Sequence, residues 1–339
     1  MKNPSQLSNE QRATSNEQRA TSHNSAQKQG TIEVTLLGRL GNQFFQYAFA
    51  RALQTKFYPE YNIVLNSYIF RNCNEEEIKV GYRNQLTDYN IVECGESCRK
   101  SRNLKFFHRA SVKLIKLYSK FISRLDGDIV GTLLRDLGGI YERFHSDFEP
   151  PKFSSSKDIQ VFGNFEHYYY FDAIRDLLLD EYTPKHELLS KNINLMNEIK
   201  NTQSVCVSIR RGDFLSDKYK DFYSVCTPEY FVEAMHRMRA QIPDCKFFIF
   251  SDDVQDVKNN FKFPYEVEYE SGDDPVWEKL RLMYSCKHFI ISNSTFSWWA
   301  QYLSRNDDKI VYAPTPWHWD KRDYRGLYTP CMRTIECKK

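Results

Sequence analysis

The sequence contains the stretch VCVSIRRGDF, Val205–Phe214, in which a mostly apolar run ends abruptly in charged residues. A short apolar run of this kind predicts a buried β-strand. In an open α/β sheet, ligands bind beyond the carboxyl ends of the strands. We therefore expect a strand that buries Val205 and Val207 and delivers Arg210 and Arg211 to a ligand-binding crevice.

The C-terminal half repeats an alternation of strand and helix patterns. Strands are expected at 204–209, 245–251, 287–292 and 309–313, and helices at 227–242, 252–261, 275–286 and 294–304. Thr227 at an N-cap position and Pro228 after it mark the start of one helix. The alternation predicts an α/β domain with a parallel, doubly wound sheet.

The N-terminal half begins with a different composition. Residues 1–30 form a polar tract in which the heptapeptide SNEQRAT occurs twice in succession. Almost no apolar residue is available there to build a core, so we expect a disordered tail. A strand at Ile32–Leu37, a turn at Gly38–Asn42 and a helix at 43–56 should follow.

The overall composition narrows the class of protein. The chain has 47 Lys and Arg against 44 Asp and Glu, a balance that does not call for a nucleic-acid partner. Its nine cysteines form no CxxC pair, which argues against a zinc site and for reduced thiols in a cytosolic protein. No run reaches the ~18 to 20 apolar residues of a membrane span, and the polar N-terminus does not resemble a secretory signal.

A basic segment stands apart from this balance. From Arg99 to Arg124 the chain carries nine Lys or Arg and no acid, at a spacing that places the charges on one side of a helix. Such a helix can lie on anionic lipid. A solvated helix whose other face is core explains the pattern equally well. We keep both interpretations, a peripheral contact with the inner membrane being one of them.

The arginine motif has a chemical meaning at the end of a strand. Arginine is always charged, and its planar fork matches a pair of phosphate oxygens. Asp213 is placed either to hold one arginine or to accept a proton. The structural alternative is an Arg–Asp ion pair that stitches a loop.

A second candidate site lies in FIISNSTFSWWA, Phe289–Ala300. A buried strand is expected to end there, with Ser294, Thr295 and Ser297 at the start of the next helix. Free N–H groups and the helix dipole bind anions at such a position, and hydroxyls add donors. Ordinary N-capping is the alternative.

Two weaker motifs accompany these. FSDD, Phe250–Asp253, would bring carboxylates that suit a ribose or a base amide. LGRLGNQFFQYA, Leu37–Ala48, has two glycines that let the backbone approach a ligand closely. The one DxD pair, Asp126–Asp128, follows the basic segment and is interpreted as a turn, so we expect neither a divalent metal nor a cofactor.

Together, GRLGNQFFQYAFARAL, VSIRRGDF, FFIFSDD and NSTFSWWA resemble the signature of the α-1,2-fucosyltransferases, glycosyltransferase family 11. GNFEHYYYFDAIRD, Gly163–Asp176, is similar to a further family segment. The resemblance runs from about residue 31 to 320 in the family's order. It implies an α/β, GT-B-like fold with two Rossmann-like domains facing a central cleft. The acceptor-binding domain would be 31–195, and the GDP-fucose-binding domain 196–339.

The resemblance also implies an activity, which is inverting, metal-independent transfer of L-fucose from GDP-fucose to the 2-OH of a galactose residue. The acceptor would be a galactose-terminated oligosaccharide, O-antigen or glycolipid. We predict Arg210, Asp213 and Asn42 as catalytic. The residues predicted to bind GDP-fucose are Gly38, Gly41, Ser208, Arg210, Arg211, Asp252, Asp253, Asn293, Ser294, Thr295 and Phe296.

The sequence departs from the family at one position. The family commonly has His two residues before the first arginine, where this chain has Ser208, whose hydroxyl can make one hydrogen bond but lacks the longer reach of an imidazole. The lack of an evident anchor makes the chain similar to soluble bacterial members, so we predict a cytoplasmic enzyme. The alternatives are a fucosyltransferase of α-1,6 type and a non-catalytic glycan- or nucleotide-binding protein.

Overall fold

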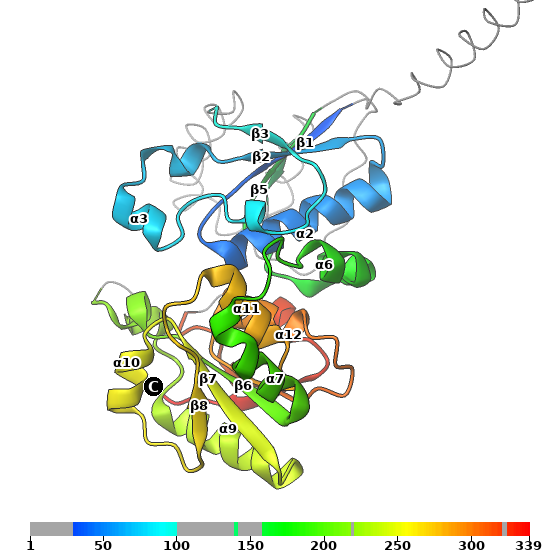
Figure 1. Cartoon of the computed structure of the whole chain (residues 1–339). Coiled ribbons are helices and arrows are strands. Elements are labelled where there is room, and N and C mark those ends of the chain that lie inside the picture. Colours follow the sequence, from blue (N-terminus) through cyan, green and yellow to red (C-terminus); the bar gives the residue numbers. More distant parts are fainter. Residues whose placement is uncertain (1–29, 100–138, 142–157, 218–219, 321–323) are drawn as a thin grey trace, which may run out of the picture.

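The computed structural model describes residues 30–99, 139–141, 158–217, 220–320 and 324–339. The expected tail at 1–30, apart from Gly30, lies outside the described residues. So do Asp126–Asp128 and the basic segment beyond Arg99. The described residues form two lobes, one above the other (Figure 1).

The N-terminal lobe is built on a parallel sheet of order β3-β2-β1-β5-β4. Its strands are β1 (Thr31–Thr35), β2 (Asn62–Asn66), β3 (Gly95–Ser97), β4 (Gly139–Tyr141) and β5 (Ile159–Phe162). Its helices are α2 (Leu40–Phe57) and α3 (Glu75–Lys79), with 3₁₀ turns η1 (Tyr68–Asn72) and η2 (Leu86–Asp88). Because β2 and β5 lie on opposite sides of β1, the sheet has its topological switch point beside β1.

The C-terminal lobe has a second parallel sheet, of order β11-β10-β9-β6-β7-β8. Its strands are β6 (Gln203–Ile209), β7 (Cys245–Ser251), β8 (Val267–Tyr269), β9 (His288–Ile291), β10 (Val311–Thr315) and β11 (Met332–Glu336). Counted from β6, this is the strand order of the dinucleotide-binding Rossmann fold, with its switch point between β6 and β9. The predicted fold class, two Rossmann-like units in a GT-B-like chain, is confirmed.

Helices surround this second sheet and connect the lobes. They are α7 (Ile193–Asn201), α8 (Lys220–Tyr223), α9 (Pro228–Gln241), α10 (Val254–Asn260), α11 (Val276–Tyr284) and α12 (Thr295–Tyr302), with η6 (Gly212–Leu215) and η7 (Arg325–Leu327). The connection between the sheets holds η3 (Tyr168–Tyr170), η4 (Asp172–Ile174), α6 (Arg175–Glu181) and η5 (Ser190–Asn192). The boundary expected between residues 195 and 196 falls inside α7. No helix in the described ranges is long and apolar enough to cross a membrane.

The strands and helices expected in the C-terminal half are present, and two strands were missed. These are β8 and β11, which lie at the two edges of the sheet. The helix expected from residue 43 begins at Leu40, because part of the predicted glycine turn forms its first turn. Thr227 is the N-cap of α9 as predicted, although its side chain makes no capping hydrogen bond.

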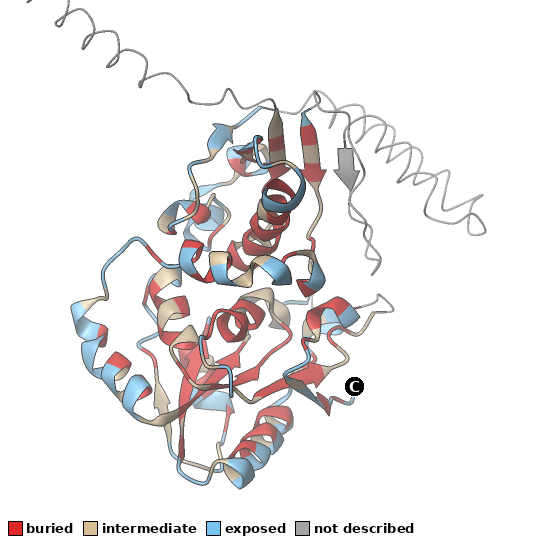
Figure 2. Cartoon of the chain, turned by 90° about the vertical axis from the view of Figure 1, so that its right-hand side faces the viewer, coloured by how far each residue is buried: buried red, intermediate tan, exposed pale blue. Residues whose placement is uncertain are grey.

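The two lobes share one hydrophobic core. α2 is buried on almost every side, including its three glutamines, Gln43, Gln46 and Gln54. Figure 2 shows buried residues along the helices between the sheets as well as in the strands. Phe44 and Phe45 of α2 contact Trp299 of α12 with ring centroids 5.5 and 4.8 Å apart. Trp299 Nε1 also donates to the carbonyl of Gly41 at 2.9 Å.

Because Gly41 has no side chain, the first turns of α2 and α12 can approach each other closely. A Cβ placed on Gly41 would lie 2.5 Å from Thr295 Oγ1 and 2.7 Å from the backbone nitrogen of Phe296. Backbone atoms inside a helix cannot move aside cheaply. The first turn of α12 therefore requires a residue without a side chain at position 41.

We expect Gly41→Ala to lower the free energy of unfolding by about 1–3 kcal/mol, because it overpacks a buried contact between helices. Urea denaturation measures the loss. Gly95→Ala is the matched control, since its Cβ would meet only the side chain of Val64 closer than 3.8 Å. A Gly41→Ala protein as stable as the control would contradict the requirement.

Lys309 lies at the other end of α12. Its ammonium donates to the carbonyl of Gln301 at 2.6 Å. Burial lowers the pKa of Lys309 to about 8 from its ordinary 10.5. The folded protein therefore binds fewer protons at this side chain than the unfolded chain does between these two values.

Stability should consequently rise with pH in that window. We expect the free energy of unfolding of the wild type, minus that of Lys309→Met, to increase from pH 8 towards pH 10.5. Denaturation of both proteins across this range measures it. Taking the difference cancels the titration of buried tyrosines, and a flat difference would contradict a buried, weakly basic Lys309.

Candidate active site

Three of the predicted motifs meet at the carboxyl edge of the second sheet. Arg210 follows β6, the NST turn at 293–295 follows β9, and Asp252 follows β7. β6 lies between the other two strands, with Ser208 in register with Ile291 of β9 and Phe250 of β7. The motifs thus flank the switch point, where this fold binds ligands.

The guanidinium of Arg210 is held by two carboxylates. Its Nη1 lies 2.7 Å from Asp252 Oδ2, and its Nη2 donates to Asp213 Oδ1. The ring of Phe214 lies beneath it, with the centroid 5.4 Å from Cζ. Arginine has five N–H donors, so these two bonds orient the fork and do not exhaust it.

Asp213 also contacts the other lobe. While Oδ1 accepts from Arg210, Oδ2 accepts from Arg39 Nη2 at 2.9 Å. Both carboxylate oxygens are therefore engaged with guanidinium groups. Of the two roles predicted for Asp213, this geometry fits the orientation of an arginine.

Sequence reasoning missed Arg39. It is the N-cap residue of α2 and stands between the two glycines of the predicted turn. Burial, and then the nearness of Arg210, lower the pKa of Arg39. The available signal was that Arg39 is the one charged residue from Leu37 to Gln43.

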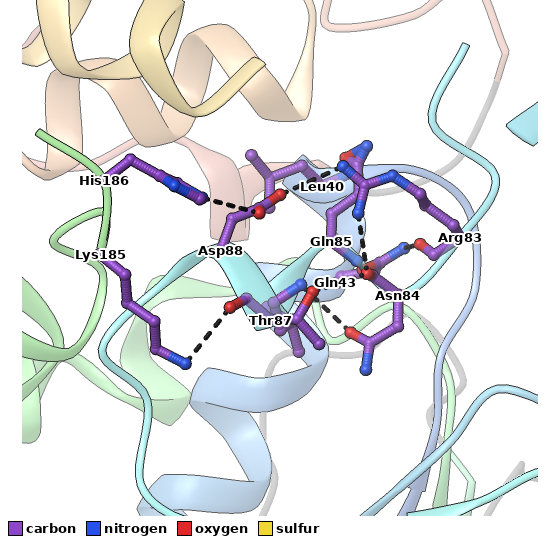
Figure 3. A network of polar contacts seen from close by, with 10 residues as sticks. Leu40, Gln43, Arg83, Asn84, Gln85, Thr87, Asp88, Lys185 and His186 are labelled. Carbon is purple, nitrogen blue, oxygen red and sulfur yellow. Dashed lines mark hydrogen bonds and ion pairs between the residues drawn. The ribbon is translucent and has the colours of Figure 1, made fainter. Parts of the chain in front are cut away.

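Two glutamine side chains, Gln43 and Gln85, hydrogen-bond to the backbone around the turn that carries Arg39 (Figure 3). Gln85 Oε1 accepts from the backbone nitrogen of Leu40 at 2.9 Å. Gln43 Oε1 accepts from the backbone nitrogen of Gln85 at 2.9 Å, and its amide donates to the carbonyl of Arg83 at 2.8 Å. Gln43 Nε2 also donates to Gly38, whose φ of +66° is a conformation that favours glycine. The turn is thus rigidly supported.

The NST turn begins α12 without a side-chain cap. Ser294 is the N-cap residue, but its hydroxyl makes no capping hydrogen bond. Thr295 Oγ1 donates instead to Asn42 Oδ1 at 2.9 Å, which connects the lobes. Phe296 is half-buried against the shared core. The first N–H groups of α12 are therefore not used by the hydroxyls beside them, as ordinary capping would require.

The N-termini of two helices meet at this point. Gly41, in the first turn of α2, lies against the first turn of α12, so two positive dipole ends are held together. Arg39 and Arg210 add their charges nearby, balanced in part by Asp213 and Asp252. The arrangement is suited to bind an anion with several oxygens.

Arg211 lies on the opposite face from Arg210. Alternation along β6 places Val205, Val207 and Ile209 in the core on one face of the sheet, and Cys206 in the core shared by the lobes. Arg211 follows the first set. Its Nε lies 2.5 Å from Asp256 of α10.

The residues around Arg211 hold the loop in shape. Its backbone nitrogen donates to Asp252 Oδ1 at 2.8 Å, so Asp252 supports both arginines. Asp253 caps α10 by accepting from the backbone nitrogen of Asp256 at 2.9 Å. The predicted donor contacts of Asp252 and Asp253 stay predictions, whereas the pairing of Arg211 with Asp256 favours the structural alternative, an ion pair that holds the loop.

Two further predicted residues are buried beside the site. The Ser208 hydroxyl lies 2.7 Å from that of Ser297, which is 3.1 Å from that of Ser292. Asn293 donates to the carbonyl of Tyr223 at 2.9 Å and lies 3.1 Å from His318 Nδ1. In this structure Ser208 connects β6 to α12, and Asn293 connects the end of β9 to Tyr223 of α8 and to His318. The contact of either side chain with a donor remains a prediction.

The part of the chain that the structure describes does not meet the requirements of a metal site. There, no three or more His, Cys, Asp or Glu side chains are grouped so that they could hold a metal ion. The prediction that the reaction needs no divalent metal remains open to experiment.

The family is decided by comparison with known proteins. Residues 141–325 match the model described as Glycosyl transferase family 11. The chain belongs to this family. The match includes β6, η6, α12 and hence the whole arginine motif and NST turn. It is therefore a glycosyltransferase, and the predicted family membership is confirmed.

Individual relatives are similar at low identity. An O-antigen biosynthesis glycosyltransferase, WbnK, from Escherichia coli is 28% identical over 301 residues, covering 83% of this chain and 93% of the relative. An alpha-1,2-colitosyltransferase from Escherichia coli is 29% identical over 308 residues, covering 87% and 94%. A galactoside 2-alpha-L-fucosyltransferase from Caenorhabditis elegans is 27% identical over 164 residues, covering 46% and 44%. The crystal structure of NodZ alpha-1,6-fucosyltransferase with GDP is 13% identical, with a TM-score of 0.45 and coverages of 81% and 92%.

The opposite positions of Arg210 and Arg211 give a prediction about nucleotide binding. On the expectation that Arg210 binds the phosphates of GDP, Arg210→Ala should weaken GDP binding roughly tenfold or more, because that charged fork is lost. Arg211→Ala should change GDP affinity little and instead lower the free energy of unfolding by about 1–3 kcal/mol, since the partly buried carboxylate of Asp256 loses its charge partner and keeps only the hydrogen bond from Asn260. Calorimetric GDP titration and urea denaturation separate the two effects. Equal losses of GDP affinity would contradict this assignment.

Proposed function

We propose that this family 11 glycosyltransferase transfers L-fucose from GDP-fucose to the 2-hydroxyl of a galactose residue. Relatives named as an alpha-1,2-colitosyltransferase and a galactoside 2-alpha-L-fucosyltransferase support the α-1,2 linkage. WbnK, named for O-antigen biosynthesis, supports a bacterial glycan as the acceptor. A cytoplasmic location, with a peripheral membrane contact through residues 99–124, is part of the same proposal.

The observation that supports the proposal most strongly is the position of the Arg210 guanidinium and its carboxylate partners. It lies at the switch point, oriented by Asp213 and Asp252. Asp213 also binds Arg39, the N-cap residue of α2, whose first turn packs on the first turn of α12. As the bond from C1 of fucose to the diphosphate breaks, negative charge develops on GDP. Preorganised donors at that place stabilise the transition state more than the ground state. They supply the role that a divalent cation has in other enzymes, so we propose a metal-independent reaction.

The remaining chemistry follows from the leaving group. The transition state at C1 is oxocarbenium-like, as at other glycosyl centres. The acceptor hydroxyl attacks from the face opposite GDP, which inverts the anomeric centre, and a base takes its proton. We assign Asp213 to orienting Arg210, because both of its oxygens already accept from guanidiniums. Asn42, whose Oδ1 is bound by Thr295, is placed to fix the lobes and to present its amide N–H groups.

A second donor is a specific alternative. Colitose is L-fucose without its 3-hydroxyl, and one of the two Escherichia coli relatives is named for its transfer. A site that hydrogen-bonds a substrate hydroxyl rejects the analogue without it, because a polar group is then left unpaired. Transfer rates with the two GDP-sugars therefore decide between them, and linkage analysis of the product separates α-1,2 from α-1,6 transfer.

The direct test is GDP release from GDP-fucose and lactose in the presence of EDTA. We expect acceptor-dependent release by the wild type, and a fall on the order of a hundredfold or more in Arg210→Ala. Arg237→Ala is the control, since that arginine pairs with Glu233 on the exposed face of α9. Release that is abolished by EDTA or unchanged in Arg210→Ala would contradict the mechanism. Failure with every galactoside offered, with GDP-fucose and with GDP-activated colitose alike, would contradict the activity and favour a non-catalytic protein.

A further inference from the structure

Arg39 connects the N-terminal lobe to the arginine motif of the other lobe. Its Nη2 donates to Asp213 Oδ2 at 2.9 Å, and Asp213 Oδ1 accepts from Arg210. One carboxylate thus bridges two guanidiniums that come from different lobes. The residues are 174 positions apart in the chain, so the contact exists only because the lobes are docked.

The position of Arg39 is firmly determined. The turn that carries it is held by Gln43 and Gln85, and its Cζ lies 5.9 Å from the ring centroid of Tyr82. The side chain is 32% exposed, so part of it is removed from water. A surface arginine that reached Asp213 by chance would not have this support.

Arg210 needs a second anchor to be held in one orientation. Asp252 binds only Nη1, and a fork held at one nitrogen can pivot about that contact. Asp213 binds Nη2 and fixes the plane. Asp213 itself lies on the short turn η6 and is 36% exposed, so its carboxylate needs an anchor of its own, and that anchor is Arg39.

We propose that Arg39 is a positioning residue for glycosyl transfer, which acts through Asp213 to fix the fork of Arg210 towards the leaving diphosphate. The inference rests on the proposed function, in which Arg210 stabilises that group. It assigns the N-terminal lobe a part in leaving-group stabilisation, in addition to the acceptor binding that the family resemblance implies for it. Docking of the lobes is then a condition for a correctly oriented Arg210.

The test uses Arg39→Lys, which keeps the charge and loses the fork. We expect kcat to fall about tenfold and up to a hundredfold, because misorientation weakens stabilisation that is realised in the transition state. The Kd for GDP, measured by calorimetry, should weaken by less than the roughly tenfold loss expected of Arg210→Ala, since the Arg210 fork is still present and Arg39 itself does not touch the donor. In an Asp213→Asn background, Arg39→Lys should have no further effect on kcat, because residues that act through one contact are not additive.

Arg175→Ala is the matched control. Arg175 also bridges the lobes, since its Nη2 donates to the carbonyls of Tyr302 and Ser304 at the far end of α12, at 3.1 and 2.8 Å. A loss of lobe contact alone would lower the melting temperature of both variants and leave the kcat of Arg175→Ala near that of the wild type. The inference is overturned if Arg39→Lys behaves like Arg175→Ala, if its effect adds to that of Asp213→Asn, or if GDP affinity falls as far as kcat.

Failure of the donor assignment is distinguishable from failure of this inference. If the wild type does not transfer fucose, the proposed donor is wrong, and the same cycle of variants is measured with GDP-activated colitose. Non-additivity of Arg39 and Asp213 with that donor supports the positioning role. Additivity with the active donor overturns it, whichever donor that is.

Discussion

The structure depends on the contact between Gly41 and the first turn of α12. Because no side chain intervenes, the first turns of two helices from different lobes pack directly on each other. Trp299 of α12 stabilises this packing by donating a hydrogen bond to the carbonyl of Gly41, and the rings of Phe44 and Phe45 pack against Trp299. The same contact brings two positive dipole ends to one place, which favours a bound anion there. Lobe docking and the candidate anion site are therefore one feature of the fold.

Each arginine side chain in and beside the site is bound to at least one carboxylate. Arg39 and Arg210 share Asp213, Arg210 also binds Asp252, and Arg211 binds Asp256 on the far face. The acids preorganise the guanidiniums, so little reorganisation is needed when a leaving group gains charge. Beneath them, hydroxyls of Ser208, Ser292 and Ser297 satisfy one another in a buried cluster. The site is thus supported both by ion pairs at its surface and by hydrogen bonds below.

The C-terminal α/β sheet could be predicted because its central strands are continuous apolar runs, whereas the two-lobe fold was implied by the family resemblance. β8 and β11 were missed because they are edge strands of sequence VEY and MRTIE, whose strand character comes from pairing with a neighbour. The place of the motifs followed from the rule that ligands bind beyond strand ends. The partners of the side chains did not follow from sequence. Arg39 joins Asp213 only through the docking of the lobes, and the hydroxyl of Ser208 is directed by Ser297 of another element. The alternation of side chains along β6 could have predicted from the sequence that Arg210 and Arg211 lie on opposite faces of the sheet.

We propose that the leaving diphosphate lies between Arg210 and the start of α12. A crystal structure of the protein with bound GDP is the decisive measurement. We expect phosphate oxygens within hydrogen-bond distance of the Arg210 guanidinium and of the first backbone N–H groups of α12, with Asp213 still bound to Arg39. A diphosphate held by Arg211, or one that lies away from the switch point between β6 and β9, would refute this placement.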